Sequence, residues 1–160
     1  MKRIGLLFCL VFTAGVFCTS FAHAQTRKPT AEETKLIRNC VEEVADDMAS
    51  QEECTFKLVV DPCVEKDGSN LGTADCYRIE RAIWDDILNE NYKKLMAAVD
   101  DPKDQAKLKE MQRAWIAFRD TTCDFYWHKI HGSMAVPMTA ACQLRETSRR
   151  AFLLAGLLLM

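Results

Sequence analysis

The stretch QRAWIAFRDTTC, residues 112–123, decides how the rest of the sequence is interpreted. It belongs to a longer stripe at helical spacing, which consists of Leu108, Met111, Trp115, Phe118, Thr122 and Tyr126. The stripe predicts a helix from Pro102 to about Ile130, with Asp101 as its cap and proline in its first turn. Because the stretch also holds Arg119 and Asp120, it fits a binding platform, part of an active site or the buried seam of a helix pair.

A second long helix precedes this one and is expected from a Thr73 cap to about Val99. Its inner face consists of Cys76, Glu80, Ile83, Trp84, Ile87, Leu88, Tyr92 and Leu95. The turn at residues 100–102 is so short that the two helices must be antiparallel. Folding the chain back there places Asn89 opposite Gln112, Asp85 within reach of Arg119, and Cys76 near Cys123.

The polar residues of the quoted stretch are therefore interpreted as the partners that a buried helix seam requires. The expected seam consists of Trp84, Asp85, Leu88, Asn89, Tyr92, Gln112, Trp115, Arg119 and Asp120. The rival interpretation is an acid–base pair drawn from Glu80, Asp85 and Asp120. No serine or cysteine nucleophile with a nearby histidine supports it, so we expect no catalytic residues and no enzyme.

The remaining segments predict further helices and no strands. Thr30 and Glu33 form a capping box before a helix from Ala31 to about Ala49. Residues 54–60 fit either a short helix or an extended piece, and residues 61–62 and 66–70 are expected to break regular structure. A last helix is expected to open at Pro137. The predicted fold is all-α, a small disulfide-stapled helical bundle built on an antiparallel helix hairpin.

The first 24 residues are typical of a cleaved signal peptide. Lys2 and Arg3 precede an apolar run over residues 4–17, and Ala22-His23-Ala24 matches the small-x-small cleavage pattern. About fourteen apolar residues fall short of the ~20 that span a bilayer. We therefore expect a single domain over residues 25–160, without a membrane anchor, in the periplasm or secreted.

Six cysteines remain after cleavage: Cys40, Cys54, Cys63, Cys76, Cys123 and Cys142. An even number in an exported chain predicts three disulfides rather than a metal site, so we expect no metal and no cofactor. The hairpin register favours Cys76–Cys123, which leaves Cys40–Cys54 and Cys63–Cys142. Pairing in sequence order, with Cys63–Cys76 and Cys123–Cys142, is the alternative.

The charge is unevenly distributed along the chain. Removal of Lys2 and Arg3 leaves 19 basic and 23 acidic side chains, a net charge of −4. Residues 25–80 carry 7 basic and 13 acidic groups, whereas residues 81–160 carry 12 and 10. An acidic N-terminal half argues against nucleic acid and anionic lipid, and it favours a basic protein partner.

Two motifs, WDDILNENY at 84–92 and LKEMQRAWIAFRDTTC at 108–123, resemble the lysozyme inhibitor LprI family. Gly132-Ser133, Cys142 and Thr147-x-x-Arg150 are similar to the tail of the family, and the likeness covers about residues 63–151. The resemblance implies an exported helical domain with disulfides that binds and blocks lysozyme. The chain departs from the family's lipoproteins because Phe8 and Phe17, rather than small residues, precede its two early cysteines.

Two flexible segments are the expected inhibitory loops, residues 66–73 and 131–137. An inhibitor of a glycosidase can insert a loop into the cleft and occupy the catalytic carboxylates. The residues expected to do so, by hydrogen bonding or by charge, are Lys66, Ser69, Asn70, His131 and Ser133. The alternative function is a structural or adaptor module of the cell envelope that has no effect on lysozyme.

Overall fold

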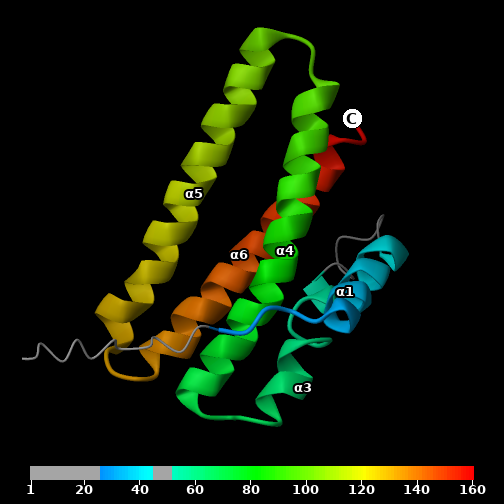
Figure 1. Cartoon of the computed structure of the whole chain (residues 1–160). Coiled ribbons are helices and arrows are strands. Elements are labelled where there is room, and N and C mark those ends of the chain that lie inside the picture. Colours follow the sequence, from blue (N-terminus) through cyan, green and yellow to red (C-terminus); the bar gives the residue numbers. More distant parts are fainter. Residues whose placement is uncertain (1–25, 45–51) are drawn as a thin grey trace, which may run out of the picture.

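The computed structural model describes residues 26–44 and 52–160, and these residues contain helices and no strand (Figure 1). The predicted all-α fold is confirmed. The predicted signal peptide and the predicted end of the first helix, beyond residue 44, lie outside the described residues.

The first helix, α1 (Ala31–Glu43), begins at the predicted capping box. The Glu33 N–H donates to the Thr30 hydroxyl (3.1 Å), and the Thr30 N–H donates to the Glu33 carboxylate (2.7 Å). Arg38 then holds α1 against the long helix α4 (Asn70–Ala98), because its guanidinium forms a two-point ion pair with Glu90 at 2.6 and 3.0 Å.

Two short helical elements follow, η1 (Glu52–Cys54) and α3 (Val60–Val64). Residues 61–62 were expected to interrupt regular structure, and that expectation is wrong because both lie inside α3. Pro62 is tolerated there because the first turn of a helix has no intrahelical acceptor for its missing N–H.

Helix α4 begins one turn earlier than predicted. Ser69, not Thr73, is its cap, and the Ser69 hydroxyl accepts a hydrogen bond from the Gly72 N–H at 3.0 Å. The Asp67 carboxylate packs against Gly72 so closely that a Cβ there would collide with it. Gly72 therefore permits a close approach at the helix start, although as a glycine it argues against a helix in the sequence.

The next two helices are α5 (Pro102–Ile130) and α6 (Ala135–Leu157). Helix α5 starts as predicted, with Pro102 in its first turn and the Asp101 carboxylate accepting the Lys103 N–H at 2.7 Å. Helix α6 starts two residues before Pro137, after a corner at His131 and Gly132, which have φ angles of 57° and 70°.

The expected hairpin seam between α4 and α5 is not formed. Helix α6 packs along α4 over the longest contact in the molecule and also contacts α5, whereas α4 and α5 hardly touch each other. Figure 1 shows α4 and α5 diverging from their connecting turn, with α6 alongside α4. The two helices are antiparallel, but each forms its interface with α6. Helix α6 therefore supplies the apolar surface that α4 and α5 were expected to offer each other.

The core lies between α4 and α6 and is closed by α1 and the 52–64 segment. Trp84 is fully buried and its ring lies 5.1 Å from that of Phe152. Beside it, the buried Glu80 carboxylate accepts N–H groups of Phe56 (2.9 Å), Val60 (3.2 Å) and the Trp84 indole (3.1 Å). Burial raises the pKa of Glu80 and the three N–H donors oppose that effect. Glu80 thus binds the 56–60 segment to α4.

The six described cysteines form three disulfides, paired in sequence order: Cys40–Cys54, Cys63–Cys76 and Cys123–Cys142. The favoured Cys76–Cys123 and Cys63–Cys142 bonds are wrong, and the sequential alternative is correct for those four residues. The physical reason is the position of α6, which separates the α4 and α5 faces that carry Cys76 and Cys123.

Candidate functional site

The two predicted loops meet at one end of the helical bundle, the lower end in Figure 1. The Asn70 side-chain amide, at the first position of α4, donates to the Ser133 hydroxyl at 3.0 Å. These residues are 63 positions apart in the sequence, so the contact brings two separate loops into one surface. We call residues 66–71 and 131–134 the tip surface.

Each half of the tip surface is closed by its own disulfide. Cys63–Cys76 spans the first loop with a sequence separation of 13, and Cys123–Cys142 spans the second with a separation of 19. Cross-links at the base of a loop reduce the number of conformations that it can adopt before binding. The tip surface is therefore preorganised by two covalent bonds and one hydrogen bond.

The predicted polar residues of the tip surface have different roles. The Ser69 hydroxyl caps α4, and Ser69 lowers the pKa of Asp67 through its side-chain and backbone hydrogen bonds. Ser133 accepts from Asn70 and keeps its own hydroxyl hydrogen for a further acceptor. Lys66 and His131 are both exposed. Of the five, Ser69 is the one already engaged in supporting the fold.

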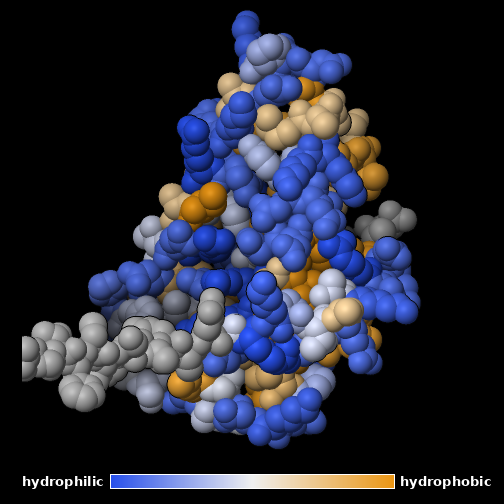
Figure 2. Space-filling model, in the orientation of Figure 1, coloured by the Kyte–Doolittle hydropathy of each residue, from blue (hydrophilic) through white to orange (hydrophobic). Residues whose placement is uncertain are grey.

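Two apolar side chains beside this hydrogen bond were missed by the sequence interpretation. Leu71, next to Asn70, is 62% exposed, and Met134, next to Ser133, is 52% exposed. Figure 2 shows a largely hydrophilic face with separate apolar patches, some of them at this lower end. Exposed apolar groups next to polar donors are the usual composition of a protein-binding surface. Their only sequence signal is an apolar residue at a helix start, since Leu71 is the second residue of α4 and Met134 is the cap residue of α6.

A groove of about 790 Å³ lies beside the tip surface, between the N-terminal segment, α3 and the start of α4. Its floor includes Leu58, Val59 and Ile79, and acidic groups on its rim include Glu32 and Asp67. The rim also holds Thr26, Arg27, Thr30, Glu33, Lys66 and Asp75. Acidic groups outnumber basic ones around this groove, in agreement with the acidic N-terminal half of the sequence.

One rim carboxylate is strongly held in its ionised form. Glu33 accepts from Arg27 at 2.6 and 2.9 Å and from the backbone and hydroxyl of Thr30. The hydrogen bond from Arg27 is the main cause that lowers the pKa of Glu33 to about 2, and the bonds from Thr30 add to it.

Six of the nine residues of the expected seam divide into a buried and an exposed group. Trp84 and Leu88 are buried in the α4–α6 core, and Tyr92 is half-buried. Asp85, Asn89 and Asp120, by contrast, are exposed. Asn89 reaches the Asp85 carboxylate of its own helix at 3.5 Å and does not meet Gln112.

The four α5 members of the seam interact with α6 or with their own helix. The side-chain amide oxygen of Gln112 accepts the Arg150 Nε–H at 3.0 Å. Trp115 lies between two guanidinium groups, with the Arg119 and Arg150 carbons 5.0 and 5.5 Å from its ring centre. Arg119 also pairs with Asp120 at 2.8 Å. Arg150 is 5% exposed, and burial lowers the pKa of its guanidinium. The quoted stretch thus docks α5 on α6.

Asp124 and His128 lie 3.4 Å apart on α5. Within residues 26–44 and 52–160, no three His, Cys, Asp or Glu side chains gather in a way that suits a metal ion. In the same part of the chain, no helix has the length and apolar character needed to cross a membrane.

The fold and its tip surface define a disulfide-linked, all-helical protein with a preorganised two-loop surface at one end. The model of the family Lysozyme inhibitor LprI matches residues 63–154, more than half of the chain. The protein belongs to this family. No curated protein and no solved structure matches the chain.

Membership in this family indicates a protein partner of the lysozyme type, because the family consists of inhibitors and not of enzymes. The matched region includes both loops of the tip surface and two of the three disulfides. Three disulfides and this family are typical of a location outside the cytoplasm.

Proposed function

We propose that the protein inhibits lysozyme by placing the tip surface in the active-site cleft of the enzyme. The observation that carries the proposal is the Asn70–Ser133 hydrogen bond, which joins two disulfide-closed loops into one rigid edge. A rigid edge loses little conformational entropy when it enters a cleft, and this favours tight binding.

The chemistry of the tip surface is suited to a cleft that contains carboxylates. Ser133 and Asn70 present hydroxyl and amide hydrogens, and Lys66 and His131 add positive or ionisable groups beside them. Leu71 and Met134 would be removed from water on binding, and apolar burial is the main favourable term in most protein association.

A basic lysozyme is the expected partner class. The acidic rim of the groove lies next to the tip surface, so a basic enzyme seated on the tip would approach complementary charge. Complementary charge mainly raises the association rate and makes it sensitive to salt. In this proposal the mature protein starts after Ala24 and acts in the periplasm or after secretion.

The test is calorimetric titration of the oxidised protein into C-type lysozyme without cell-wall substrate, followed by inhibition of wall hydrolysis. We expect a 1:1 complex that weakens with salt and a stoichiometric loss of hydrolysis. The double variant Leu71→Ala, Met134→Ala should weaken binding by at least about tenfold, which corresponds to roughly 1.4 kcal/mol.

The matched control is Leu153→Ala, because Leu153 is 50% exposed on α6 at the other end of that helix. It should leave the affinity unchanged. Asn70→Ala, which removes the donor to Ser133, should also weaken binding, and Asn89→Ala is its control on the same helix. Absence of a complex with lysozyme would refute the proposal and make the envelope adaptor the leading function.

A further inference from the structure

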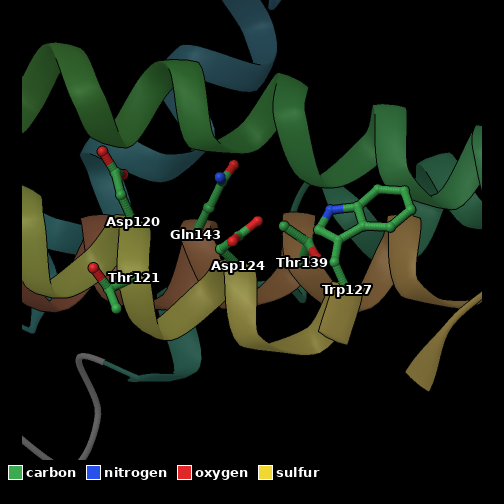
Figure 3. Close-up of a pocket in the computed structure, with 6 residues that line it drawn as sticks. All are labelled: Asp120, Thr121, Asp124, Trp127, Thr139 and Gln143. Carbon is green, nitrogen blue, oxygen red and sulfur yellow. The ribbon is translucent and has the colours of Figure 1, made fainter. Parts of the chain in front are cut away.

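A second cavity, whose lining residues are not among those of the tip surface, lies between α5 and α6 and has a volume of about 470 Å³. We call it the tryptophan groove; its lining residues are Asp120, Thr121, Asp124, Trp127, Thr139 and Gln143. Figure 3 shows the side chains of Asp120, Asp124, Trp127 and Gln143 directed toward the α4 ribbon. The groove exists because α4 and α5 diverge, leaving α6 as its floor. Its volume lies within the roughly 300–1,000 Å³ typical of small-ligand sites.

Trp127 differs from the other two tryptophans in its surroundings. Trp84 is fully buried in the core, and Trp115 lies between two guanidinium groups. Trp127 is 44% exposed, and among the described residues no aromatic ring or guanidinium stacks on it. A large indole surface on the wall of a cavity is a ready platform for the apolar face of a ligand.

The floor of the groove contains a hydroxyl group without a partner. The Thr139 oxygen is buried and makes no hydrogen bond within the described part of the chain. Thr147, two turns further along α6, instead donates to the main-chain carbonyl of Gln143 at 2.7 Å, as helical threonines commonly do. A buried polar group normally has a partner, so the Thr139 hydroxyl has a hydrogen bond to offer to a polar ligand in the groove.

The charges around the groove argue against an ionic ligand of either sign. Asp120 and Asp124 are acceptors, but Arg119 lies 2.8 Å from Asp120 and Arg81 donates to the Gln143 side chain. The two guanidinium groups lie beside the lining and not in it; Arg119 offsets the charge of Asp120, and an anion would meet the two carboxylates. The groove therefore offers hydrogen-bond donors and acceptors without a net charge that would select an ion, and it suits a ligand that is neutral overall.

A neutral saccharide fits all three observations. Each sugar hydroxyl is one donor and two acceptors, which matches a lining of carboxylates, hydroxyls and an amide. One face of a pyranose ring carries C–H groups and can stack on indole. We propose that the tryptophan groove binds a neutral oligosaccharide, with Trp127 as the stacking platform and Asp124, Thr139 and Gln143 as polar contacts. This binding requires no lysozyme and is independent of the proposed inhibition.

The test is titration of the oxidised protein with a panel of neutral oligosaccharides, namely chitotriose, cellotriose, maltotriose and mannotriose. Tryptophan fluorescence and calorimetry report binding. At least one sugar should bind saturably at 1:1. Trp127→Ala should weaken this binding by at least about tenfold, which corresponds to roughly 1.4 kcal/mol. Thr139→Val, which removes only the hydroxyl, should weaken it about threefold to tenfold.

Phe125→Ala is the matched control, because Phe125 is 61% exposed on the same helix but is not part of the groove lining. It should bind sugar within about twofold of the wild type. Trp127→Ala should keep the wild-type thermal unfolding curve and the wild-type affinity for lysozyme. No binding to any sugar at about 10 mM would overturn the proposal. Equal losses in Phe125→Ala and Trp127→Ala, or tighter binding of arginine methyl ester or phosphate than of any sugar, would overturn it as well.

Discussion

Helices α4 and α5 have the same length, 29 residues, yet they have opposite relations to the core. Helix α4 buries nine residues, whereas α5, all of which the structure describes, buries Cys123 alone. On α5, Ile116, Phe118, Phe125 and Trp127 are all at least 40% exposed. The two helices therefore have different tasks: α4 stabilises the fold, and α5 is held to α6 by a few specific contacts.

The same contrast separates α6 from α1. Helix α6 shares the core with α4 and buries ten residues, whereas α1 buries only Ile37 over Ala31–Glu43. Both peripheral helices, α1 and α5, carry one cysteine of a disulfide. A short apolar contact and a covalent bond thus replace extensive burial in each of them. Substitutions in core and peripheral helices should differ accordingly.

The largest difference is expected for aromatic truncations. Trp84→Ala on α4 removes a fully buried ring and should lower the free energy of unfolding by about 3–5 kcal/mol. Phe118→Ala on α5 removes a ring that is 55% exposed and should change it by less than about 0.5 kcal/mol. Denaturant unfolding of the oxidised proteins measures both, and equal losses would refute the contrast between the helices.

The Cys123–Cys142 bond should account for much of the attachment of α5. Replacing both cysteines with alanine should lower the free energy of unfolding by about 2–4 kcal/mol. Hydrogen exchange should also become faster for α5 amides than for α4 amides. The Cys40–Cys54 double variant is the control, and it should leave α5 exchange unchanged. If hydrogen exchange became faster by the same factor in α4 and α5, the two helices would unfold as one unit.

A smaller effect is expected at the buried carboxylate of α4. Glu80→Gln would place a side-chain NH₂ against N–H donors that now meet an oxygen, and should destabilise the protein by about 1–3 kcal/mol. Glu90→Gln is the same substitution on the exposed face of the same helix, where only the ion pair with Arg38 is lost. It should lower the free energy of unfolding by about 0.2–1 kcal/mol. Urea unfolding at neutral pH should rank Glu80→Gln as the more damaging variant.

The smallest effect concerns α1 and depends on pH. Because the pKa of Glu33 is lowered to about 2, its stabilising contribution is present above its unfolded pKa of about 4.3 and is lost as pH falls toward 2. Glu33→Gln should therefore show a shallower fall in stability between about pH 5 and pH 2 than the wild type. Glu32→Gln, a neighbouring exposed substitution, should follow the wild-type curve. If the free energy of unfolding fell equally with decreasing pH in Glu33→Gln and in the wild type, this contribution would be ruled out.

Local chemistry could be predicted from the sequence with some success. The capping box of α1, the Asp101-Pro102 start of α5 and the all-helical fold follow from short-range hydrogen bonding and spacing. The start of α4 was missed because Gly72 has a low helix propensity, while its value in admitting the Asp67 carboxylate depends on three-dimensional contact. Element type is a local property, but a close approach between residues is not.

The arrangement of the helices could not be predicted in the same way. A short turn requires α4 and α5 to be antiparallel, but it does not require them to touch. The last helix supplies buried Leu144, Ala151 and Leu154, and its place beside α4 changed both the disulfide pairing and the partners of Gln112. Trp127 and Thr139 lie 12 residues apart on different helices, and no motif spacing connects them. The tryptophan groove is visible only once α6 is in place.

The order of the disulfides has a consequence for how the molecule is made. The six described cysteines pair consecutively along the chain, the first with the second, the third with the fourth and the fifth with the sixth, so the three covalent loops neither overlap nor nest. A chain that crosses a membrane from its N-terminus presents these cysteines to an oxidase pair by pair. If each newly emerged thiol is oxidised with the unpaired thiol that precedes it in the chain, the native bonds form directly. The protein should therefore mature under a simple thiol oxidase, without an isomerase to reshuffle mispaired bonds.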